Sequence, residues 1–235
     1  MKRTILFVLL AFVAGHISIA CTTAIISGKA TPDGRPILWK HRDSDNFNNK
    51  MMFVKGAKFN YIGLVNAEDT LQQIWGGTNS AGFSIMNSAS YNLKAKDDRS
   101  VFQDQEGMLM KLALSTCATL DEFRKLLDSL PKPLGVEANF GVIDAHGGAG
   151  YFEANNFKYK FFDANDSQVA PNGYLIRTNY SFSGRENEGS GYNRYNTASA
   201  LIDEAYKDKM VTPGFFLTKA TISLRHELTN TYLAQ

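Results

Sequence analysis

The fold is decided by CTTAIISGKATPDGRPILWKHRD, residues 21–43. Residues 21–28 are apolar and β-branched, and they predict a strand that begins on Cys21 itself. Residues 31–36 predict a turn, because proline presets φ and Asp-Gly tolerates the positive φ of a tight hairpin. Residues 37–43 predict a returning strand. Such a hairpin would bring the polar end of the second strand back beside Cys21.

The residues before this hairpin have the pattern of a secretory signal peptide. Residues 1–3 are cationic, residues 5–13 form an apolar run of nine, and residues 18–20 place small side chains before Cys21. The apolar run is too short to span a hydrocarbon core of about 30 Å, which takes roughly 20 residues. We therefore predict cleavage after Ala20 and a periplasmic or secreted protein.

Cleavage after Ala20 would place a thiol and a free α-amine on Cys21. The thiol has an ordinary pKa of about 8.5 and the amine one of about 7.7 to 8.0, so the amine can act as base toward its own nucleophile. The alternative is a lipoprotein that is acylated on Cys21 and anchored in a membrane. Ser18 and Ile19 depart from the residues that a lipobox prefers, which favours the free cysteine.

The charge of the chain excludes one class of partner. The formal net charge of the 235 residues is +2, and Lys2 and Arg3 supply both positive charges. Residues 21–235 therefore carry 23 basic and 23 acidic side chains, whereas nucleic-acid binders normally carry a basic excess. The balanced charge suits a small uncharged or mixed-charge substrate, and we predict no nucleic acid and no membrane contact unless Cys21 is lipidated. A homo-oligomer is left open.

Cysteine and histidine usage narrows the chemistry further. Two cysteines, Cys21 and Cys117, could form at most one bridge, so no disulfide framework is predicted. Cys117 ends a helical stretch without a basic neighbour, and we interpret it as a buried structural thiol. No two of the histidines have metal-ligand spacing; they are His16, His41, His146 and His226. The histidine spacing therefore predicts no His-rich metal site, and the hydrolysis mechanism predicted below implies no metal and no organic cofactor.

The opening hairpin resembles that of a known family. A strand that starts at Cys-Thr, an Asp-Gly turn and a returning strand with a basic-x-x-Asp unit is similar to the N-terminal nucleophile hydrolases related to choloylglycine hydrolase, penicillin V acylase and penicillin-forming acyltransferases. The resemblance implies that Asp43 accepts a hydrogen bond from the amine of Cys21. Lys40 stands where the family has arginine. Arg42 could serve instead, because strand alternation aims it like Lys40.

A second motif of this family follows in WGGTNSAGFSIMN, residues 75–87. It resembles the family's Gly-x-Asn-x-x-Gly turn, after which a strand carries an asparagine of the oxyanion hole. The resemblance assigns that role to Asn87, whose NH₂ group can donate to an oxyanion in any protonation state. Asn79 is interpreted as a turn residue.

Two further motifs complete the predicted site. RTNYS, residues 177–181, resembles the segment that supplies a second asparagine, here Asn179. GYNRY, residues 191–195, resembles the unit whose arginine lies near the catalytic thiol, here Arg194. A guanidinium there would favour the thiolate and restrain the neighbouring carboxylate.

The remaining segments of the chain predict the helices and strands of an α+β protein. Two helices are expected within residues 106–129, the second with a capping box at Thr119 and Glu122. Three antiparallel strands and a final helix are expected at residues 140–144, 149–153, 158–163 and 195–208. The resemblance implies the four-layer αββα sandwich as one domain, residues 21–235. Relatives commonly continue for several more strands, so a shortened or incomplete C-terminal part is expected.

The predicted function is hydrolysis of linear amide C–N bonds through a thioester on Cys21. The substrate types implied are bile-salt conjugates, penicillin V and N-acyl amino acids. One alternative is a related cysteine dipeptidase, since residues 28–34 also match that family, and another is a lipidated binding protein without catalysis. A glycosidase pair of Asp144 and Glu153 is also conceivable, but both residues fall near turns.

Overall fold

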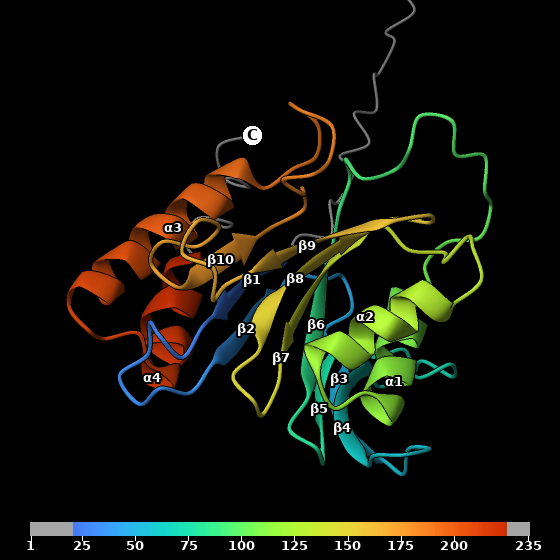
Figure 1. Ribbon diagram of the computed structural model, residues 1–235, viewed down its shortest axis with the longest axis horizontal. Helices are drawn as coiled ribbons and strands as arrows, with labels where there is room; N and C mark the ends of the chain where they lie inside the picture. Colours follow the sequence, from blue (N-terminus) through green and yellow to red (C-terminus); the bar gives the residue numbers. More distant parts are fainter. Residues whose placement is uncertain (1–20, 225–235) are drawn as a thin grey trace, which may run out of the picture.

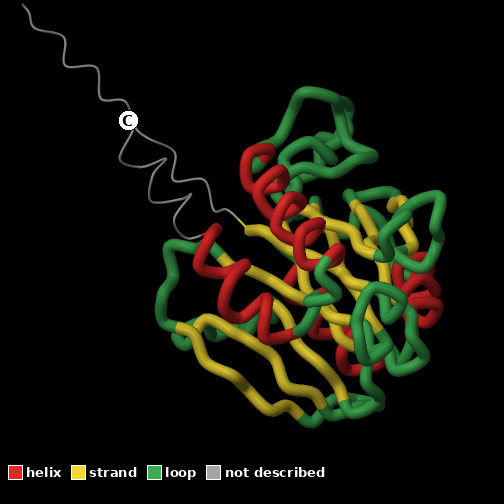
Figure 2. Tube along the Cα trace, turned by 90° about the vertical axis from the view of Figure 1, so that its left-hand side faces the viewer, coloured by secondary structure: helices red, strands yellow, loops and turns green. Residues whose placement is uncertain are grey.

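The computed structural model describes residues 21–224, and the predicted signal peptide lies outside them. The described chain has four layers, with two β-sheets face to face between two helical layers (Figure 1). Figure 2 looks from the left-hand side of Figure 1, where the C-terminal helices lie, and shows helices crossing in front of the strands. The αββα sandwich is thereby confirmed. No helix within residues 21–224 is long and apolar enough to cross a membrane.

The smaller sheet contains the predicted hairpin. Its order is β10 (Tyr174–Arg177), β1 (Cys21–Ile26) and β2 (Ile37–Arg42), and all neighbours are antiparallel. Strand β1 begins on Cys21 as predicted. The turn between β1 and β2 includes Gly34 at a φ of +73°, which favours glycine. The hairpin therefore forms where its turn residues predict it.

The larger sheet has seven antiparallel strands in sequential order. They are β3 (Asn49–Val54), β4 (Tyr61–Asn66), β5 (Gly76–Asn79), β6 (Ser84–Ala89), β7 (Ala138–Ile143), β8 (Ala149–Ala154) and β9 (Tyr159–Asp163). The predicted strands from residue 140 to 163 are confirmed within two residues. The hairpin of β3 and β4 was not predicted, because β3 at the sheet edge is largely exposed and lacks a clear alternation.

The helices cover the two outer faces of the sheets (Figure 1). They are α1 (Glu106–Thr116), α2 (Leu120–Ser129), α3 (Tyr192–Lys207), α4 (Pro213–Phe215) and the π-helical turn η1 (Phe216–Ala220). The Thr119 side chain accepts a hydrogen bond from the Glu122 backbone N–H, so the predicted N-cap is confirmed. Helix α3 starts at Tyr192, three residues earlier than expected, and Arg194 therefore lies inside its first turn.

Three hydrophobic clusters fill the three gaps between the layers. Phe123 of α2 packs against the outer face of the larger sheet, and Trp39 of β2 packs toward α3 and η1. Ile25 of β1 and Met86 of β6 share the cluster between the sheets. Alternation along β1 thus sends Ile25 toward the larger sheet and Ile26 toward the helices. This alternation fixes which side chains of β1 and β2 can meet the larger sheet.

The two carboxylates of the glycosidase alternative are structural. Asp144 accepts hydrogen bonds from the backbone N–H groups of Leu120, His146 and Gly148. Glu153 is fully buried and pairs with Arg177 at 2.6 Å. Both carboxylates are engaged in structural hydrogen bonds, so Asp144 and Glu153 do not form a glycosidase site.

Candidate active site between the sheets

The register of the β1–β2 hairpin places two cations on the thiol face. Cys21 lies opposite Arg42, and Thr23 lies opposite Lys40. Directly opposed residues of an antiparallel pair share one face of the sheet. Ile25, on the same face, packs between the two sheets. The Cys21 thiol therefore faces the larger sheet together with both candidate cations.

Lys40 links the two sheets and orients Asn87. Its Nζ donates to the backbone oxygen of Trp75 at 2.8 Å and to Oδ1 of Asn87 at 3.0 Å. An ammonium group has donors only, so it selects the oxygen of the amide. Within residues 21–224, Nδ2 of Asn87 donates no hydrogen bond to the protein. The amide is thus held with its donor group free for a ligand.

Lys40 also has a perturbed titration. Burial lowers the pKa of Lys40 to about 8, the negative charge of a Cys21 thiolate opposes this shift, and Arg42 reinforces it. The ammonium form therefore persists up to neutral pH and loses its proton near pH 8. The ammonium of Lys40 is a compact point charge, unlike the planar guanidinium of the arginine that the sequence resemblance leads one to expect at this position.

Arg42 is committed to a different part of the sheet. Its guanidinium donates to Oδ1 of Asn49 at 2.6 Å and to Oδ1 of Asn66 at 2.9 Å, and it lies over the Trp75 ring at 5.2 Å. These contacts tie it to the β3–β4 hairpin. Of the two cations that alternation allows, Lys40 is the one bonded to Asn87.

Asn179 holds the nitrogen of Cys21. Its Oδ1 accepts from the backbone nitrogen of Cys21 at 3.0 Å and from Nη2 of Arg194 at 2.8 Å. Its Nδ2 donates to the backbone oxygen of Ala89 at 3.0 Å, which fixes the orientation of the amide. The residue is fully buried. The backbone nitrogen of Cys21 thus has a defined acceptor.

Arg194 fastens the start of β1 from the helix side. Its Nη1 donates to the backbone oxygen of Cys21 at 2.5 Å and to Oγ1 of Thr22 at 3.1 Å. The guanidinium thus binds the carbonyl of Cys21 and the amide of Asn179; its effect on a neighbouring carboxylate stays a prediction. Thr22 was not predicted as a site residue, although strand alternation does place it on the face toward α3.

Asp43 lies just beyond β2 and is half-buried. Within residues 21–224 it makes no hydrogen bond to Cys21, whose nitrogen donates to Asn179 instead. Its charge acts on His41: burial lowers the pKa of His41, Asp43 opposes that shift, and Arg194 adds to it. The role of Asp43 toward the amine of Cys21 stays a prediction.

Asn79 of the second motif and Cys117 at the end of α1 have structural roles. The Asn79 amide donates to the backbone oxygens of Leu114 and Cys117, and its Oδ1 accepts from Ala81 and Phe83. Cys117 is a buried free thiol, and burial raises its pKa. Both residues behave as the sequence indicates.

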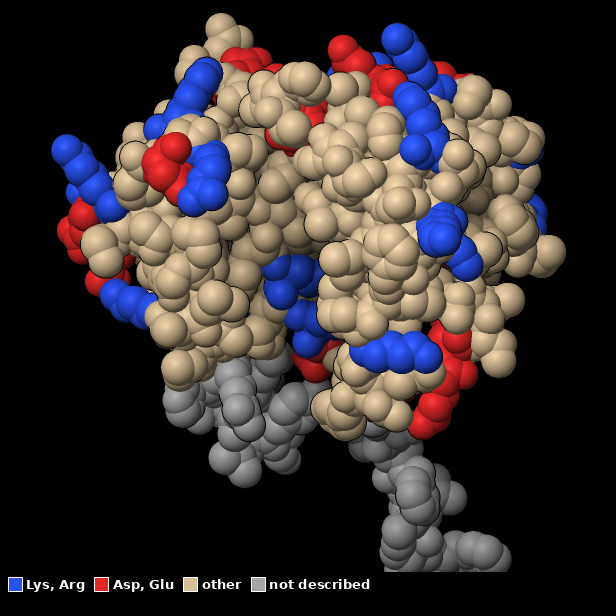
Figure 3. All heavy atoms as spheres, turned by 90° about the horizontal axis from the view of Figure 1, so that it is seen from below, with Lys and Arg blue, Asp and Glu red and all other residues tan. Residues whose placement is uncertain are grey.

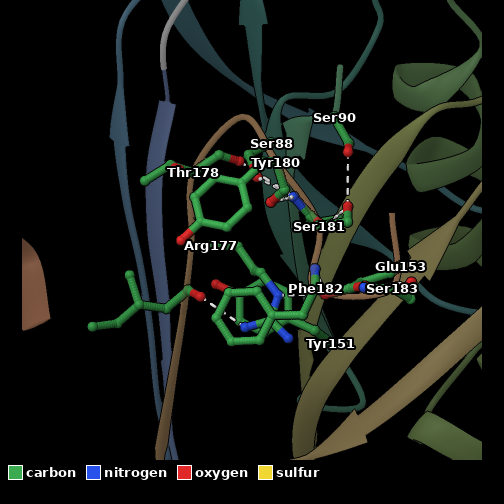
Figure 4. Close-up of polar contacts among 12 residues, drawn as sticks. Ser88, Ser90, Tyr151, Glu153, Arg177, Thr178, Tyr180, Ser181, Phe182 and Ser183 are labelled. Atoms are coloured by element: carbon green, nitrogen blue, oxygen red, sulfur yellow. Dashed lines mark hydrogen bonds and ion pairs between the residues drawn. The ribbon is translucent and has the colours of Figure 1, made fainter. Parts of the chain in front are cut away.

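A buried polar network supports the segment that carries Asn179 (Figure 4). Asn139 Nδ2 donates to the backbone oxygens of Thr178 at 3.2 Å and Tyr180 at 3.3 Å, on either side of Asn179. Ser181 Oγ bonds to Asn139 Oδ1 at 2.5 Å and to Ser90 Oγ at 2.7 Å. Satisfied buried networks rigidify what they contact. Asn139 and Ser90 carry no motif, so the sequence offered no signal for this support.

An apolar groove of about 490 Å³ opens beside Lys40. Apolar side chains of β2, β3, β4, β6 and β7 form much of its walls; they are Leu38, Met51, Ile62, Leu64, Met86 and Ile143, with Trp75 before β5. Lys40 and Arg42 supply its cationic end. Figure 3 shows a hollow with recessed basic side chains on one face of the molecule. The sequence did not predict this groove, because one of its walls, with Met51, Ile62 and Leu64, belongs to the unpredicted β3–β4 hairpin.

These features define the class of fold. Two face-to-face sheets between helical layers, with a cysteine at the first residue of an inner strand, form the αββα fold of the N-terminal nucleophile hydrolases. The resemblance found in the sequence is thereby confirmed for the fold. Within residues 21–224, no cluster of three His, Cys, Asp or Glu side chains is arranged to hold a metal ion.

Solved structures with this fold include two hydrolases. A variant of the conjugated bile acid hydrolase of Clostridium perfringens matches with a TM-score of 0.55 and 13% identity, over 87% of this chain and 79% of that one. The N-acylethanolamine-hydrolyzing acid amidase ortholog of Caenorhabditis elegans matches with a TM-score of 0.57 and 15% identity, over 82% of this chain and 86% of that one. No protein-family model and no curated protein matches the sequence.

Proposed function

We propose that this chain is an exported cysteine amidohydrolase that cleaves linear N-acyl amides through a thioester on Cys21. The observation that carries the proposal is the hydrogen bond from the Cys21 nitrogen to Asn179 Oδ1, at the first residue of a buried strand. Removal of residues 1–20 would turn that nitrogen into an α-amine that is already oriented. The nucleophile and its base would then sit on one residue.

The proposed reaction begins when the α-amine takes the thiol proton. The Cys21 sulfur attacks the substrate carbonyl, and the amine passes the proton to the leaving nitrogen as the C–N bond breaks. Water then attacks the thioester, releases the acid and restores the thiol. Asn179 and Arg194 hold the amine and the carbonyl of Cys21 in place, so these two are positioning residues.

We assign the stabilisation of the oxyanion to a hydrogen bond from Nδ2 of Asn87. Lys40 holds the amide oxygen, and Nδ2 needs no reorientation when negative charge develops on the substrate oxygen. The ammonium of Lys40 adds positive charge on the thiol face of β2 and would favour the thiolate.

The apolar groove supports an N-acyl amide with a hydrophobic acyl group. Its walls offer area to an aliphatic or ring-shaped acyl chain, and only Lys40 and Arg42 are charged. The two hydrolases with this fold act on conjugated bile acids and on N-acylethanolamines, which supports the same bond type here. A dipeptide would place a charged amine among these apolar walls and beside two cations, so the groove favours an acyl amide over a dipeptide.

The proposal is tested by producing the chain with residues 1–20 present and measuring the mass of the exported protein. We expect a free Cys21 at the N-terminus, and turnover of a conjugated bile salt, penicillin V or an N-acyl amino acid with little turnover of dipeptides. Diacylated Cys21 without turnover would instead identify a lipoprotein. Efficient cleavage of dipeptides alone would overturn the acyl-amide assignment in favour of a dipeptidase.

Asn87→Ala is expected to lower kcat by about 10²- to 10³-fold with little change in KM, because one oxyanion donor is lost. Asn87→Asp keeps an acceptor for Lys40 but removes Nδ2, so the same loss is expected with an almost unchanged Tm. Asn196→Ala, on the exposed side of α3, is the matched control and should retain full activity. Wild-type kcat in Asn87→Asp would refute the role of Nδ2.

A further inference from the structure

A larger cavity lies apart from the candidate active site. It has a volume of about 670 Å³, and none of Cys21, Lys40, Asn87 or Asn179 lines it. Three segments form its walls: the loop after β6, the β8–β9 hairpin and the chain at residues 183–185. The first two lie side by side at the edge of the larger sheet (Figure 1). It shares no lining residue with the apolar groove beside Lys40.

Hydrogen bonds hold the three walls together. Asn92 Nδ2 donates to the backbone oxygens of Ser181 at 3.1 Å and Arg185 at 3.0 Å, and the Arg185 backbone N–H donates to Asn92 O at 2.9 Å. Asn155 Nδ2 of the hairpin donates to the backbone oxygen of Leu93 at 3.0 Å. The cavity is therefore built into the fold before any ligand binds, which lowers the cost of binding.

Most of the charged groups around the cavity are cations. The charged residues that line it are Lys94, Lys96, Lys158, Lys160, Arg185 and Glu153. The negative charge of Glu153 is already balanced by Arg177. Its oxygens also accept hydrogen bonds from the backbone N–H of Phe182 and from the N–H and hydroxyl of Ser183 (Figure 4). Arg185 pairs with Glu188 at 2.5 Å. Four lysines thus remain.

These four lysines have no acceptor of their own. Within residues 21–224, none of their Nζ atoms makes a hydrogen bond or an ion pair, although Lys160 lies 5.2 Å from the centroid of the Phe162 ring. The charges of Lys94 or Lys96 act on the carboxylates of Asp98, Glu137 and Glu188. Asp98 is bonded to Asn156, and Glu188 to Arg185. Asp98 and Glu137 therefore offset part of the charge of Lys94, and the excess positive charge of the cavity lies on the exposed residues Lys96, Lys158 and Lys160.

We propose that this cavity binds a multivalent oxyanion of the oligophosphate class. A single carboxylate offers two oxygens and one charge, which would leave most of the four ammonium groups unpaired. An oligophosphate offers several charges and many acceptor oxygens, and lysine binds phosphate as a point charge without strict orientation. The phosphate source is either a soluble oligophosphate or a phosphorylated lipid headgroup, and both share this chemistry.

Isothermal titration of the full chain with tripolyphosphate at about 0.15 M salt tests the proposal. We expect saturable binding of one anion per chain. The double variant Lys158→Gln/Lys160→Gln should weaken the binding by about tenfold or more, since two of the four cations are lost. The control Lys55→Gln/Lys207→Gln removes the same charge from exposed lysines that do not line the cavity and should bind like the wild type.

A second arm distinguishes the two sources of phosphate. Sedimentation with phosphatidylcholine vesicles that carry phosphatidylinositol bisphosphate should remove the chain from solution only if the ligand is a headgroup. Binding in either arm that is lost in Lys158→Gln/Lys160→Gln supports the cavity. Absence of binding in both arms, or an equal loss in the control variant, would overturn it. Neither measurement depends on amide hydrolysis.

Discussion

Cys21→Ala is expected to reduce amide hydrolysis by about 10⁴-fold or more, because removal of a covalent nucleophile costs most of the catalytic acceleration. The substitution leaves the backbone nitrogen and oxygen of Cys21 in place. These atoms carry the bonds to Asn179 and Arg194, so the fold should persist. The measurement is kcat/KM on an N-acyl amide, together with Tm and the mass of the N-terminal peptide after substrate is added.

The other cysteine of the chain supplies the matched control. Cys117 is buried at the C-terminal end of α1 and lies outside the candidate site, so Cys117→Ala should keep activity and lose only some stability. Wild-type turnover in Cys21→Ala, or an acyl group found on any residue other than Cys21, would remove the basis of the proposed mechanism.

Breaking the buried ion pair of Arg177 and Glu153 is expected to destabilise the protein strongly. Arg177→Met leaves the Glu153 carboxylate buried without its charged partner, which costs about 3 to 5 kcal/mol. It also removes a guanidinium that stacks 3.9 Å from the centroid of the Phe182 ring. For a domain of this size the loss corresponds to a Tm lower by about 6 to 20 °C. Thermal unfolding by circular dichroism measures it.

An exposed pair provides the comparison for this prediction. Lys219 and Glu204 lie 2.7 Å apart with side chains 52% and 58% exposed. Lys219→Met should cost no more than about 1 kcal/mol, because solvent screens exposed pairs. If Arg177→Met shifted Tm no more than Lys219→Met, the Arg177–Glu153 pair would not be a support of the segment that carries Asn179.

Local chemistry made much of the scaffold predictable. The Asp-Gly turn predicted the first hairpin, and the capping residue Thr119 predicted the start of α2. Both signals act between residues a few positions apart, where φ preferences and single hydrogen bonds dominate. The β3–β4 hairpin escaped prediction, because an exposed edge strand needs no regular alternation.

The sequence motifs predicted which residues come together at the candidate site, but they predicted the hydrogen bonds between them less well. Asn179 and Arg194 were identified by their motifs, and they do meet at the start of β1. The acceptor of the Cys21 nitrogen, however, is Asn179, which lies 158 positions away along the chain. Asp43, much nearer in sequence, makes no such bond within residues 21–224.

Strand periodicity determined that Lys40 and Arg42 share one face of their strand, because side chains alternate strictly along a strand. The register of the β1–β2 hairpin places that face on the side of the Cys21 thiol. Strand periodicity could not tell which cation reaches Asn87. That choice depends on the distance between two sheets and on competing partners: Asn49 and Asn66 hold Arg42, which leaves Lys40 for Asn87. Contacts between distant segments arise from packing of the whole chain, and no local pattern encodes them.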